Sequence, residues 1–271
     1  MACQETVLFI LTIPSKSGLA ALVIEPHGAY NLMLLELIPR TEIERPIKLP
    51  SEGYESLSKV VARTVAELVK EKPDACLGLP TGRTPVACYR YLSEDSRQGL
   101  IDWSKTRCFG LDEYVDAAEQ HSFRRFLFDN LYKNTNVSEK NRFNPIFVDD
   151  YDKCIADAGG LDLCILGLGR NGHIAFNEPG TPRSSYTHSV VLSESTRQAN
   201  AEFFVGGTIP TRAVTMGLST ILSARRIILM VSGDNKKDIL IKAMRGPVCK
   251  EVPASYLQEH DNVMILADFD Y

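Results

Sequence analysis

One stretch of the sequence gathers residue types that can move protons, the segment Gly167–Gly180 (GLGRNGHIAFNEPG). It contains His173, and histidine is the side chain whose charge changes near neutral pH. Asn171 is close enough in sequence to orient the imidazole. Glu178 is close enough to accept or relay a proton. A lone histidine is more often structural. Here the neighbouring Asn171 and Glu178, and the glycines, which permit close approach of a ligand to the backbone, favour general acid and base chemistry.

A second candidate base lies in the pair Asp112-Glu113, which is followed by Tyr114. The two acids follow an apolar run that we expect to be a strand, and burial near a sheet edge raises the pKa of a carboxyl toward that of a general base. A helix or turn cap is an equally ordinary role for acids in this position. The residues alone therefore do not select Asp112 as a catalyst.

Two turns have the composition of an anion site. The first consists of Thr81, Gly82, Arg83 and Thr84. It lies between an expected strand and an expected helix, where free backbone N–H groups and the helix dipole suit a phosphate or carboxylate. The second, Gly233–Lys236, adds the compact cation Lys236. Neither turn has the Walker A or the dinucleotide pattern. Each alone is also compatible with a tight turn or a solvated lysine, but the occurrence of both in one sheet favours a phosphate.

These segments must be positioned by alternating strands and helices. Expected strands are 75–79, 106–111, 145–148, 161–166, 188–192, 226–231 and 263–267; expected helices are 51–72, 86–94, 122–132, 193–204, 211–222 and 235–244. We expect Ser51 to cap the first helix and Ser193 or Ser195 the fourth. The alternation predicts a single doubly wound α/β domain, with a mainly parallel sheet and helices on both faces. Ligands in such folds bind outside the carboxyl ends of the strands, where the four segments above lie.

The first 45 residues have a different pattern. Short apolar runs at 6–14, 19–25 and 32–37 predict a small β-meander. We therefore expect an N-terminal extension, residues 1–45, before the α/β domain of residues 46–271. The run 6–14 is too short to span a bilayer and lacks a basic start and a cleavage signal, so we do not expect a signal peptide.

Composition narrows the class of partner. The chain has 271 residues, of which 44% are hydrophobic and 24% charged, as in a globular protein with a sizeable core. Its net charge of −4 and the lack of a basic run give no electrostatic footprint for nucleic acid or an anionic membrane. The 7 scattered cysteines include no C-x-x-C pair. We expect a small-molecule ligand, no metal and a reducing, cytoplasmic location.

Six motifs occur in the order of a known family. They are GLPTGRTP (78–85), FGLDEYV (109–115), GLGRNGHIAFNEPG (167–180), STRQANAEFF (195–204), VTMGLSTIL (214–222) and SGDNKK (232–237). In these motifs the chain resembles the glucosamine-6-phosphate deaminases, also called glucosamine-6-phosphate isomerases, over roughly residues 46–268. The G-x-N-G-H-x-x-x-N-E-P and L-D-E-Y motifs together are highly specific to that family.

The resemblance implies a Rossmann-like domain that converts glucosamine 6-phosphate and water to fructose 6-phosphate and ammonia without a cofactor. It implies that His173, supported by Glu178, opens the pyranose ring. Asp112 would then move the C2 proton to C1 through an enolamine, after which water attacks C2 and ammonia leaves. The Thr81–Thr84 turn and Lys236 would hold the phosphate.

The sequence departs from the family pattern at three positions. Asn171 stands where one branch has an aspartate and another has asparagine; the neutral amide can orient the histidine but lacks the charge of a carboxylate. Arg83 replaces a residue that is usually small. Glu202 stands where the glucosamine enzymes usually place a phosphate-binding arginine. A carboxylate there repels a phosphate unless it turns away or pairs with Arg83, whose guanidinium then supplies the missing contact.

Other functions remain open. Galactosamine-6-phosphate deaminases also lack the arginine and share the LDLC-x-LGLG-x-NGH run. A 6-phosphogluconolactonase-like hydrolase has the same fold, although Asp112–Tyr114 and Asn177–Pro179 follow the deaminase pattern. A non-catalytic sugar-phosphate sensor needs a helix-turn-helix, which the N-terminal region does not offer. The chain ends soon after the last expected strand, without the extension of the allosteric hexameric branch, so the resemblance implies a monomer or small homo-oligomer with little allostery.

Overall fold

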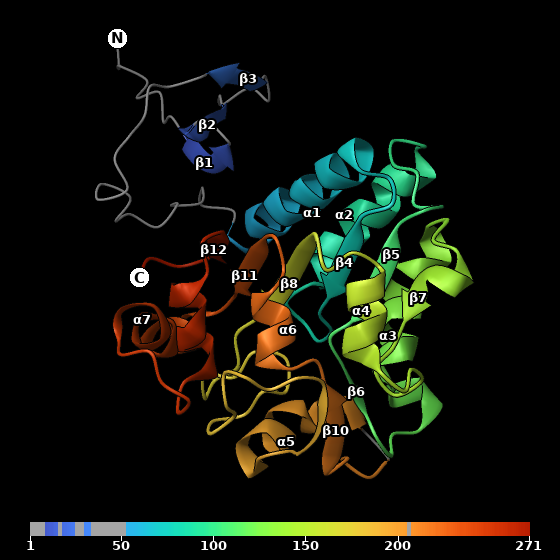
Figure 1. The fold of residues 1–271 in the computed structure, drawn as a ribbon, viewed down its shortest axis with the longest axis vertical. Helices are drawn as coiled ribbons and strands as arrows, with labels where there is room; N and C mark the ends of the chain where they lie inside the picture. Colours follow the sequence, from blue (N-terminus) through green and yellow to red (C-terminus); the bar gives the residue numbers. More distant parts are fainter. Residues whose placement is uncertain (1–8, 16–17, 25–29, 34–52, 205–206) are drawn as a thin grey trace. The chain divides into compact units, whose positions relative to one another are not determined.

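The computed structural model describes residues 9–15, 18–24, 30–33, 53–204 and 207–271 (Figure 1). The chain divides into two compact units, Met1–Lys48 and Leu49–Tyr271. In the first unit, β1 (Phe9–Ser15), β2 (Gly18–Ile24) and β3 (Tyr30–Met33) pair as an antiparallel meander. The predicted meander is confirmed for these strands, whereas residues 34–37 of the expected third strand lie outside the described residues.

The second unit is built on a six-stranded sheet in the order β12-β11-β8-β4-β5-β7. Its strands are β4 (Cys76–Leu79), β5 (Arg107–Gly110), β7 (Arg142–Phe143), β8 (Leu163–Gly167), β11 (Ile227–Val231) and β12 (Val263–Ala267). Every pairing in this sheet is parallel. The mainly parallel sheet expected from the sequence is confirmed, and its carboxyl ends all lie at one edge.

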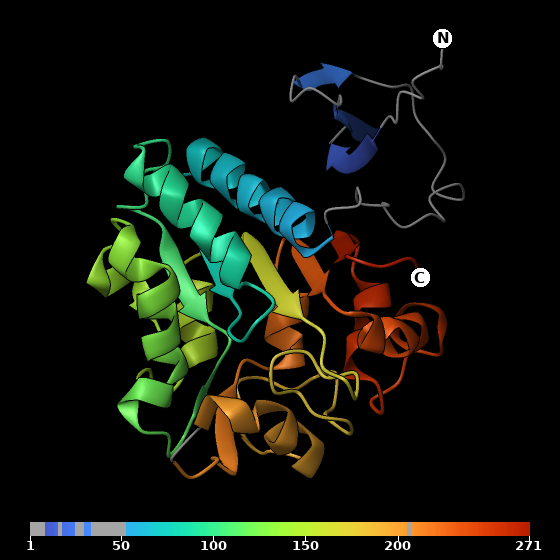
Figure 2. The same cartoon turned by 180° about the vertical axis from the view of Figure 1, so that it is seen from behind.

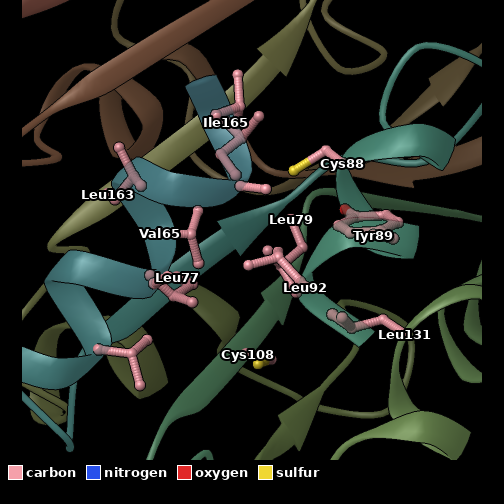
Figure 3. Close-up of a cluster of buried hydrophobic side chains, with 14 of the residues drawn as sticks. Val65, Leu77, Leu79, Cys88, Tyr89, Leu92, Cys108, Leu131, Leu163 and Ile165 are labelled. Carbon is pink, nitrogen blue, oxygen red and sulfur yellow. The ribbon is translucent and has the colours of Figure 1, made fainter. Parts of the chain in front are cut away.

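Helices cover both faces of this sheet, as predicted. One face carries α1 (Tyr54–Glu71), α2 (Val86–Arg97) and α3 (Phe123–Asn130), and the other α4 (Tyr151–Asp157), α6 (Leu218–Leu222) and α7 (Lys237–Arg245). Alternation along β8 explains the two layers, since successive side chains of a strand point to opposite faces. Leu163 and Ile165 pack with the first set of helices (Figure 3), and Cys164 and Leu166 pack with the second.

The helix starts follow the capping residues only in part. Ser122 caps α3 by accepting a hydrogen bond from the backbone N–H of Arg125. Ser193, rather than Ser195, caps α5 (Glu194–Asn200). Helix α1 begins after Gly53, and Ser51, its expected cap, lies outside the described residues. The expected helix 193–204 ends in a 3-10 turn, Ala201–Phe204.

A small antiparallel sheet was not expected from the sequence. It consists of β6 (Asp112–Tyr114), β10 (Arg212–Thr215) and β9 (His188–Val191), in the order β6-β10-β9. In Figure 2 the arrow of β8, in yellow, points toward the part of the chain that holds the orange β10. The second sheet therefore lies beyond the carboxyl ends of the large one.

Two predicted elements are wrong. The expected helix 211–222 is a strand in its first part, because Val214 and Thr215 are β-branched and their backbone pairs with β6 and β9. At Gly217 the backbone then lies very close to another segment. A Cβ atom on residue 217 would be 2.2 Å from the backbone oxygens of Ser185 and Tyr186. Only 218–222 is helical.

The expected strand 145–148 is a turn, and the strand of this region is the two-residue β7. The Asn144 side chain accepts a hydrogen bond from the backbone N–H of Ile146 at 3.0 Å, and the N–H of Phe147 donates to the Asn144 carbonyl at 3.1 Å. These local bonds replace a strand ladder.

Among the described residues, no helix has both the length and the apolar character needed to cross a bilayer.

Candidate active site

A cavity of about 730 Å³ lies beyond the carboxyl ends of the central strands. Residues that follow β4, β5, β8 and β11 line it, as the sequence predicted for the four turns. Of the residues singled out from the sequence, those that line it are Thr81, Gly82, Arg83, Thr84, Asp112, His173 and Lys236. Asn171 and Glu178 do not line it but contact His173 from behind. The structure therefore brings all nine side chains to one place.

Asp112 reaches this cavity as the first residue of β6. Thr215 of β10 is paired opposite it, and the backbone N–H of Met216 bonds to the carbonyl of Leu111 at 2.7 Å, so the strand is held on both sides of this residue. The Asp112 side chain is buried, and its Oδ1 atom has no hydrogen-bond partner among the described residues. Burial, with a smaller contribution from the nearby Glu113 carboxylate, raises the pKa of Asp112 to about 8. An unpaired carboxyl with a raised pKa suits a group that accepts and returns a proton.

Glu113, the next residue, has the opposite environment. Its Oε1 accepts the backbone N–H groups of Tyr114 and Phe123, and its Oε2 accepts that of Arg124 and the Asn144 amide, all within 2.9 Å. The side chain is buried and caps the start of α3. Because adjacent residues of a strand face opposite ways, one acid of the pair anchors a helix and the other faces the cavity. This distinction selects Asp112, which the residues alone did not.

His173 is held by a cluster of polar side chains. The Asn171 Oδ1 accepts the His173 backbone N–H at 3.2 Å, and the Asn171 amide donates to Glu178 Oε2 at 2.7 Å. The same Oε2 lies 3.8 Å from His173 Nδ1. Burial acts to raise the pKa of Glu178, but the neighbouring His173 and the hydrogen bonds from the Thr196 hydroxyl and the Asn171 amide outweigh it, so the pKa falls to about 2. Glu178 is therefore a carboxylate at neutral pH, next to the ring.

The sequence analysis missed Thr196, the third residue of α5. Its hydroxyl donates to Glu178 Oε1 at 2.5 Å and lies 3.5 Å from His173 Nδ1. No motif signals this contact, because 18 residues separate the two bonded side chains along the chain. The position of Thr196 three residues after the cap Ser193 is the only local signal, and it identifies the helix start rather than the partner.

The loop that carries His173 is tightly constrained. A Cβ atom at Gly169 would lie 2.3 Å from His173 Nε2, so the imidazole packs directly on this glycine. Ala175 has φ 48, a left-handed value that costs energy for a residue with a side chain. The buried Asn177 amide secures the loop by donating to the carbonyls of Ile174 and Met216 at 3.0 and 2.9 Å. The loop is held in a conformation it would not adopt alone.

Substitution Gly169→Ala should therefore lower the turnover number by at least about tenfold, since a reacting group displaced by 1 Å can cost about a hundredfold. The new methyl group would push the His173 ring away from its position. Gly110→Ala is the control, because a Cβ there meets its nearest atom at an ordinary 3.5 Å. Steady-state kinetics of the two folded variants checks this; equal effects would mean that the ring has room to move.

The Thr81–Thr84 turn forms another part of the cavity wall. Gly82 has φ 86, a left-handed value that glycine adopts freely, and this lets the chain turn sharply between β4 and α2. The hydroxyl of Tyr54, on α1, donates to the Arg83 carbonyl at 3.0 Å and accepts the backbone N–H of Ala87 at 3.1 Å. The turn is thus fixed by Tyr54, and both Tyr54 and the turn line the cavity.

Lys236 enters from the turn after β11. The backbone of this turn is fixed by Asp268, whose carboxylate accepts the Ser232 hydroxyl at 2.6 Å and the Gly233 N–H at 2.9 Å. Burial, together with the nearby charge of Arg170, lowers the pKa of Lys236, and Asp268 partly opposes this. Arg170 also lines the cavity and was not singled out from the sequence. Two neighbouring cations that line one cavity are suited to an anion.

Arg83 and Glu202 form an ion pair at the cavity wall. The guanidinium also lies 5.7 Å from the centre of the Phe203 ring, within reach of a cation–π contact. Both side chains remain more than half exposed, at 65% and 52%. Of the two outcomes considered for Glu202, turning away or pairing with Arg83, the structure shows the pairing.

The arrangement suits acid and base chemistry on an anionic, polar small molecule. It combines one unpaired carboxyl, one histidine backed by a carboxylate, and three cations, one of them paired with Glu202, in one cavity. In the part of the chain that the structure describes, no three His, Cys, Asp or Glu side chains gather in a way that could hold a metal ion.

Comparison with known proteins places this arrangement in a family. The sequence profile described as glucosamine-6-phosphate isomerases/6-phosphogluconolactonase matches residues 50–266. The glucosamine-6-phosphate deaminase of Clostridium perfringens strain 13 is 41% identical over 231 residues, which cover 81% of this chain and 96% of that protein. Glucosamine-6-phosphate deaminase 2 of Bacillus subtilis strain 168 is 42% identical over 234 residues, covering 82% and 94%.

Solved structures agree with this placement. A monomeric glucosamine-6-phosphate deaminase superimposes with a TM-score of 0.74 at 38% identity, covering 78% of this chain and 92% of that one. A 6-phosphogluconolactonase from Trypanosoma cruzi has a TM-score of 0.64 at 19% identity, covering 82% and 94%. The second likeness, at this identity, concerns the fold alone.

Proposed function

The chain belongs to the family of glucosamine-6-phosphate isomerases and 6-phosphogluconolactonases, and on that premise we propose that it is a glucosamine-6-phosphate deaminase. The observation that carries the choice within the family is the buried, unpaired Asp112 at the cavity. Hydrolysis of a lactone requires no proton transfer between carbon atoms, whereas isomerisation of an amino sugar does. Relatives named as glucosamine-6-phosphate deaminases at about 41% identity support the same choice.

The reaction begins with ring opening. His173, with Glu178 beside its Nδ1, takes the proton of the anomeric hydroxyl and delivers a proton to the ring oxygen, so that the C1–O5 bond breaks and a C1 aldehyde forms. Glu178, a carboxylate at neutral pH, lies beside the ring during this transfer. Asn171 hydrogen-bonds both the Glu178 carboxylate and the His173 backbone N–H, and so fixes their relative position.

Asp112 then carries out the isomerisation. Its carboxylate removes the proton from C2 while a proton of the substrate ammonium group moves to O1, which gives an enolamine. Return of the first proton to C1 leaves a C2 iminium. Water adds to C2, the C2–N bond breaks and the nitrogen leaves with the released proton as ammonium, so that glucosamine 6-phosphate and water become fructose 6-phosphate and ammonium without change of oxidation state. One carboxyl on one face of the sugar suffices, in agreement with the single unpaired acid at the cavity.

The phosphate binds to the Thr81–Thr84 turn and Lys236, which line the same cavity. Arg83 supplies the guanidinium that the family usually provides from the position of Glu202, and Glu202 holds it in place through their ion pair. This remote binding energy positions C1 and C2 against Asp112.

Lys236→Met should raise KM for glucosamine 6-phosphate by about 10 to 100-fold, the effect of losing one charge-assisted hydrogen bond, and should change kcat much less. The substitution removes the ammonium group and keeps the partly buried stem. Lys237→Met is the control, since Lys237 is exposed and does not line the cavity. A change in kcat alone, with KM unaffected, would contradict a phosphate contact.

The test of the proposed function is ammonia release measured side by side on glucosamine 6-phosphate, galactosamine 6-phosphate and their N-acetylated forms, with hydrolysis of 6-phosphogluconolactone assayed in parallel. We expect glucosamine 6-phosphate to be turned over fastest. Preference for galactosamine 6-phosphate would assign the other epimer, lactone hydrolysis would assign the hydrolase, and binding without turnover would indicate a sensor.

We further propose that residues 46–271 form the catalytic domain and residues 1–45 an extension to it. The match of the family profile to residues 50–266 and the separate unit Met1–Lys48 support this division. A monomer or small homo-oligomer is proposed, supported by a solved relative that is described as monomeric. The metabolic role of the family supports a cytoplasmic location.

A further inference from the structure

Glu178 is held from two sides, and only one of them belongs to the motif that carries His173. Asn171 donates to Oε2 at 2.7 Å. The other oxygen, Oε1, accepts the hydroxyl of Thr196 at 2.5 Å, from the start of α5. Thr196 is only 2% exposed, so water cannot easily replace its hydroxyl. The orientation of this carboxylate therefore depends on a residue outside the motif.

The hydrogen-bond directions around Thr196 follow from its single proton. Glu178 is a carboxylate and can only accept, so the Thr196 proton goes to Oε1. Ser193 donates its own hydroxyl to Thr196 Oγ1 at 2.9 Å. The Thr196 oxygen thus presents only a lone pair toward His173 Nδ1, at 3.5 Å.

These directions determine which nitrogen of His173 carries the proton. The groups facing Nδ1 are Thr196 Oγ1 at 3.5 Å and Glu178 Oε2 at 3.8 Å, and both are acceptors. A neutral imidazole in this position keeps its proton on Nδ1 and leaves a free lone pair on Nε2. Within the described ranges, no hydrogen bond reaches Nε2, so that nitrogen is available to the sugar in the cavity.

We propose that Thr196 is a positioning residue for the ring-opening step: by holding Glu178 Oε1 it turns Oε2 toward His173 and keeps the imidazole protonated at Nδ1. The proposal rests on the proposed deaminase function for its catalytic consequence, but the tautomer itself is a property of the protein alone. Without the hydroxyl, Glu178 keeps only the hydrogen bond from Asn171 and is less strictly oriented, and the Nε2-protonated tautomer, which cannot accept a proton from the anomeric hydroxyl, gains population.

Kinetics of three variants tests the catalytic part. Thr196→Val keeps the shape and removes the hydroxyl; it should lower kcat by about tenfold, the effect of losing one hydrogen bond to a charged group, with KM within about twofold. Thr196→Ser should restore most of kcat. Thr220→Val is the matched control, because the buried Thr220 hydroxyl also bonds a carboxylate, that of Asp152, away from the cavity. It should lower the melting temperature without lowering kcat.

Two kinetic outcomes would overturn the proposal. If Thr196→Val had the kcat of the parent, the hydroxyl would have no positioning role. If Thr196→Ser were as impaired as Thr196→Val, the loss would come from methyl packing rather than from the hydrogen bond. Melting curves of all variants establish that the comparison is made between folded proteins.

Nitrogen NMR of histidine-labelled protein tests the tautomer without any assay of activity. The chain has only 5 histidines, and His173→Asn identifies the signal of His173. The parent should show Nδ1 protonated and Nε2 unprotonated at alkaline pH, and Thr196→Val should show a mixture. A parent ring protonated at Nε2, or an unchanged tautomer in Thr196→Val, would overturn the proposal. Lack of ammonia release together with the expected shifts would instead overturn the deaminase function and leave the role of Thr196 intact.

Discussion

Asp112→Asn should reduce ammonia release from glucosamine 6-phosphate by about 10³-fold or more, within the range that a positioned general base contributes. The amide has nearly the shape of the carboxyl but cannot take a proton from C2. Because Asp112 Oδ1 has no hydrogen-bond partner among the residues described, the substitution breaks no protein contact of that atom. Binding of the substrate, measured by calorimetry, should persist. Near-parental turnover would remove Asp112 from the mechanism.

The same carboxyl predicts a pH dependence. Its pKa is raised from an ordinary 3.8 to about 8 in the folded protein, by burial first and by Glu113 second. A carboxyl with a raised folded pKa contributes most to stability below about pH 4, and this contribution is lost as the pH rises toward 8. The kcat/KM of the parent should increase over the same interval, as the base form becomes populated.

Ionising the buried Asp112 carboxyl costs stability, and Asp112→Asn cannot ionise. The melting temperature of this variant should therefore exceed that of the parent by a margin that grows between about pH 4 and 8. Asp162→Asn is the matched control. Asp162 is an equally buried carboxylate, but it is paired with Lys72 and Arg225 at 2.8 and 3.0 Å, away from the cavity. It should lose stability and keep kcat. A constant margin for Asp112→Asn across this pH range would mean that the carboxyl is not held protonated.

His173→Asn should lower kcat by a few hundredfold, because ring opening loses both its base and its acid. KM should change little, since the histidine does not contact the phosphate in the proposed binding mode. His260→Asn is the control: His260 bonds the Ala224 carbonyl and the Asn262 N–H, 2.8 and 3.0 Å away, and does not line the cavity. Loss of activity that is equal in both variants would indicate that a damaged fold, rather than lost chemistry, is responsible.

Much of the large sheet was predictable because its strands are short apolar runs between turns, and a buried parallel strand has that pattern whatever its neighbours are. The four cavity segments followed from the same reasoning, since residues after such strands meet at one edge. The region 211–222 was mispredicted for a different reason. Its strand exists only because β6 and β9 lie on either side of it, and pairing between distant segments leaves little signal in the local sequence.

The chemistry of the site was predictable to a lesser degree. In the sequence, Asp112 and Glu113 are simply two adjacent acids, and either could be the base. Only the structure shows that Glu113 already accepts hydrogen bonds from Phe123, Arg124 and Asn144. Thr196 lies in the motif STRQANAEFF, but that motif does not show its partner, which depends on the proximity of α5 to the loop of Glu178. Residue types predicted that acids, a histidine and cations would meet, while the proton positions among them depend on contacts that the fold creates.

The order of the strands in the large sheet separates the acid Asp112 from the cation Lys236 at the cavity. Asp112 follows β5 and Lys236 follows β11, and two strands, β8 and β4, lie between them. Three strand spacings of about 4.8 Å therefore lie between the strands that position the acid and the cation. With its phosphate at Lys236, the proposed substrate would extend along this line toward Asp112, so we expect a single productive orientation.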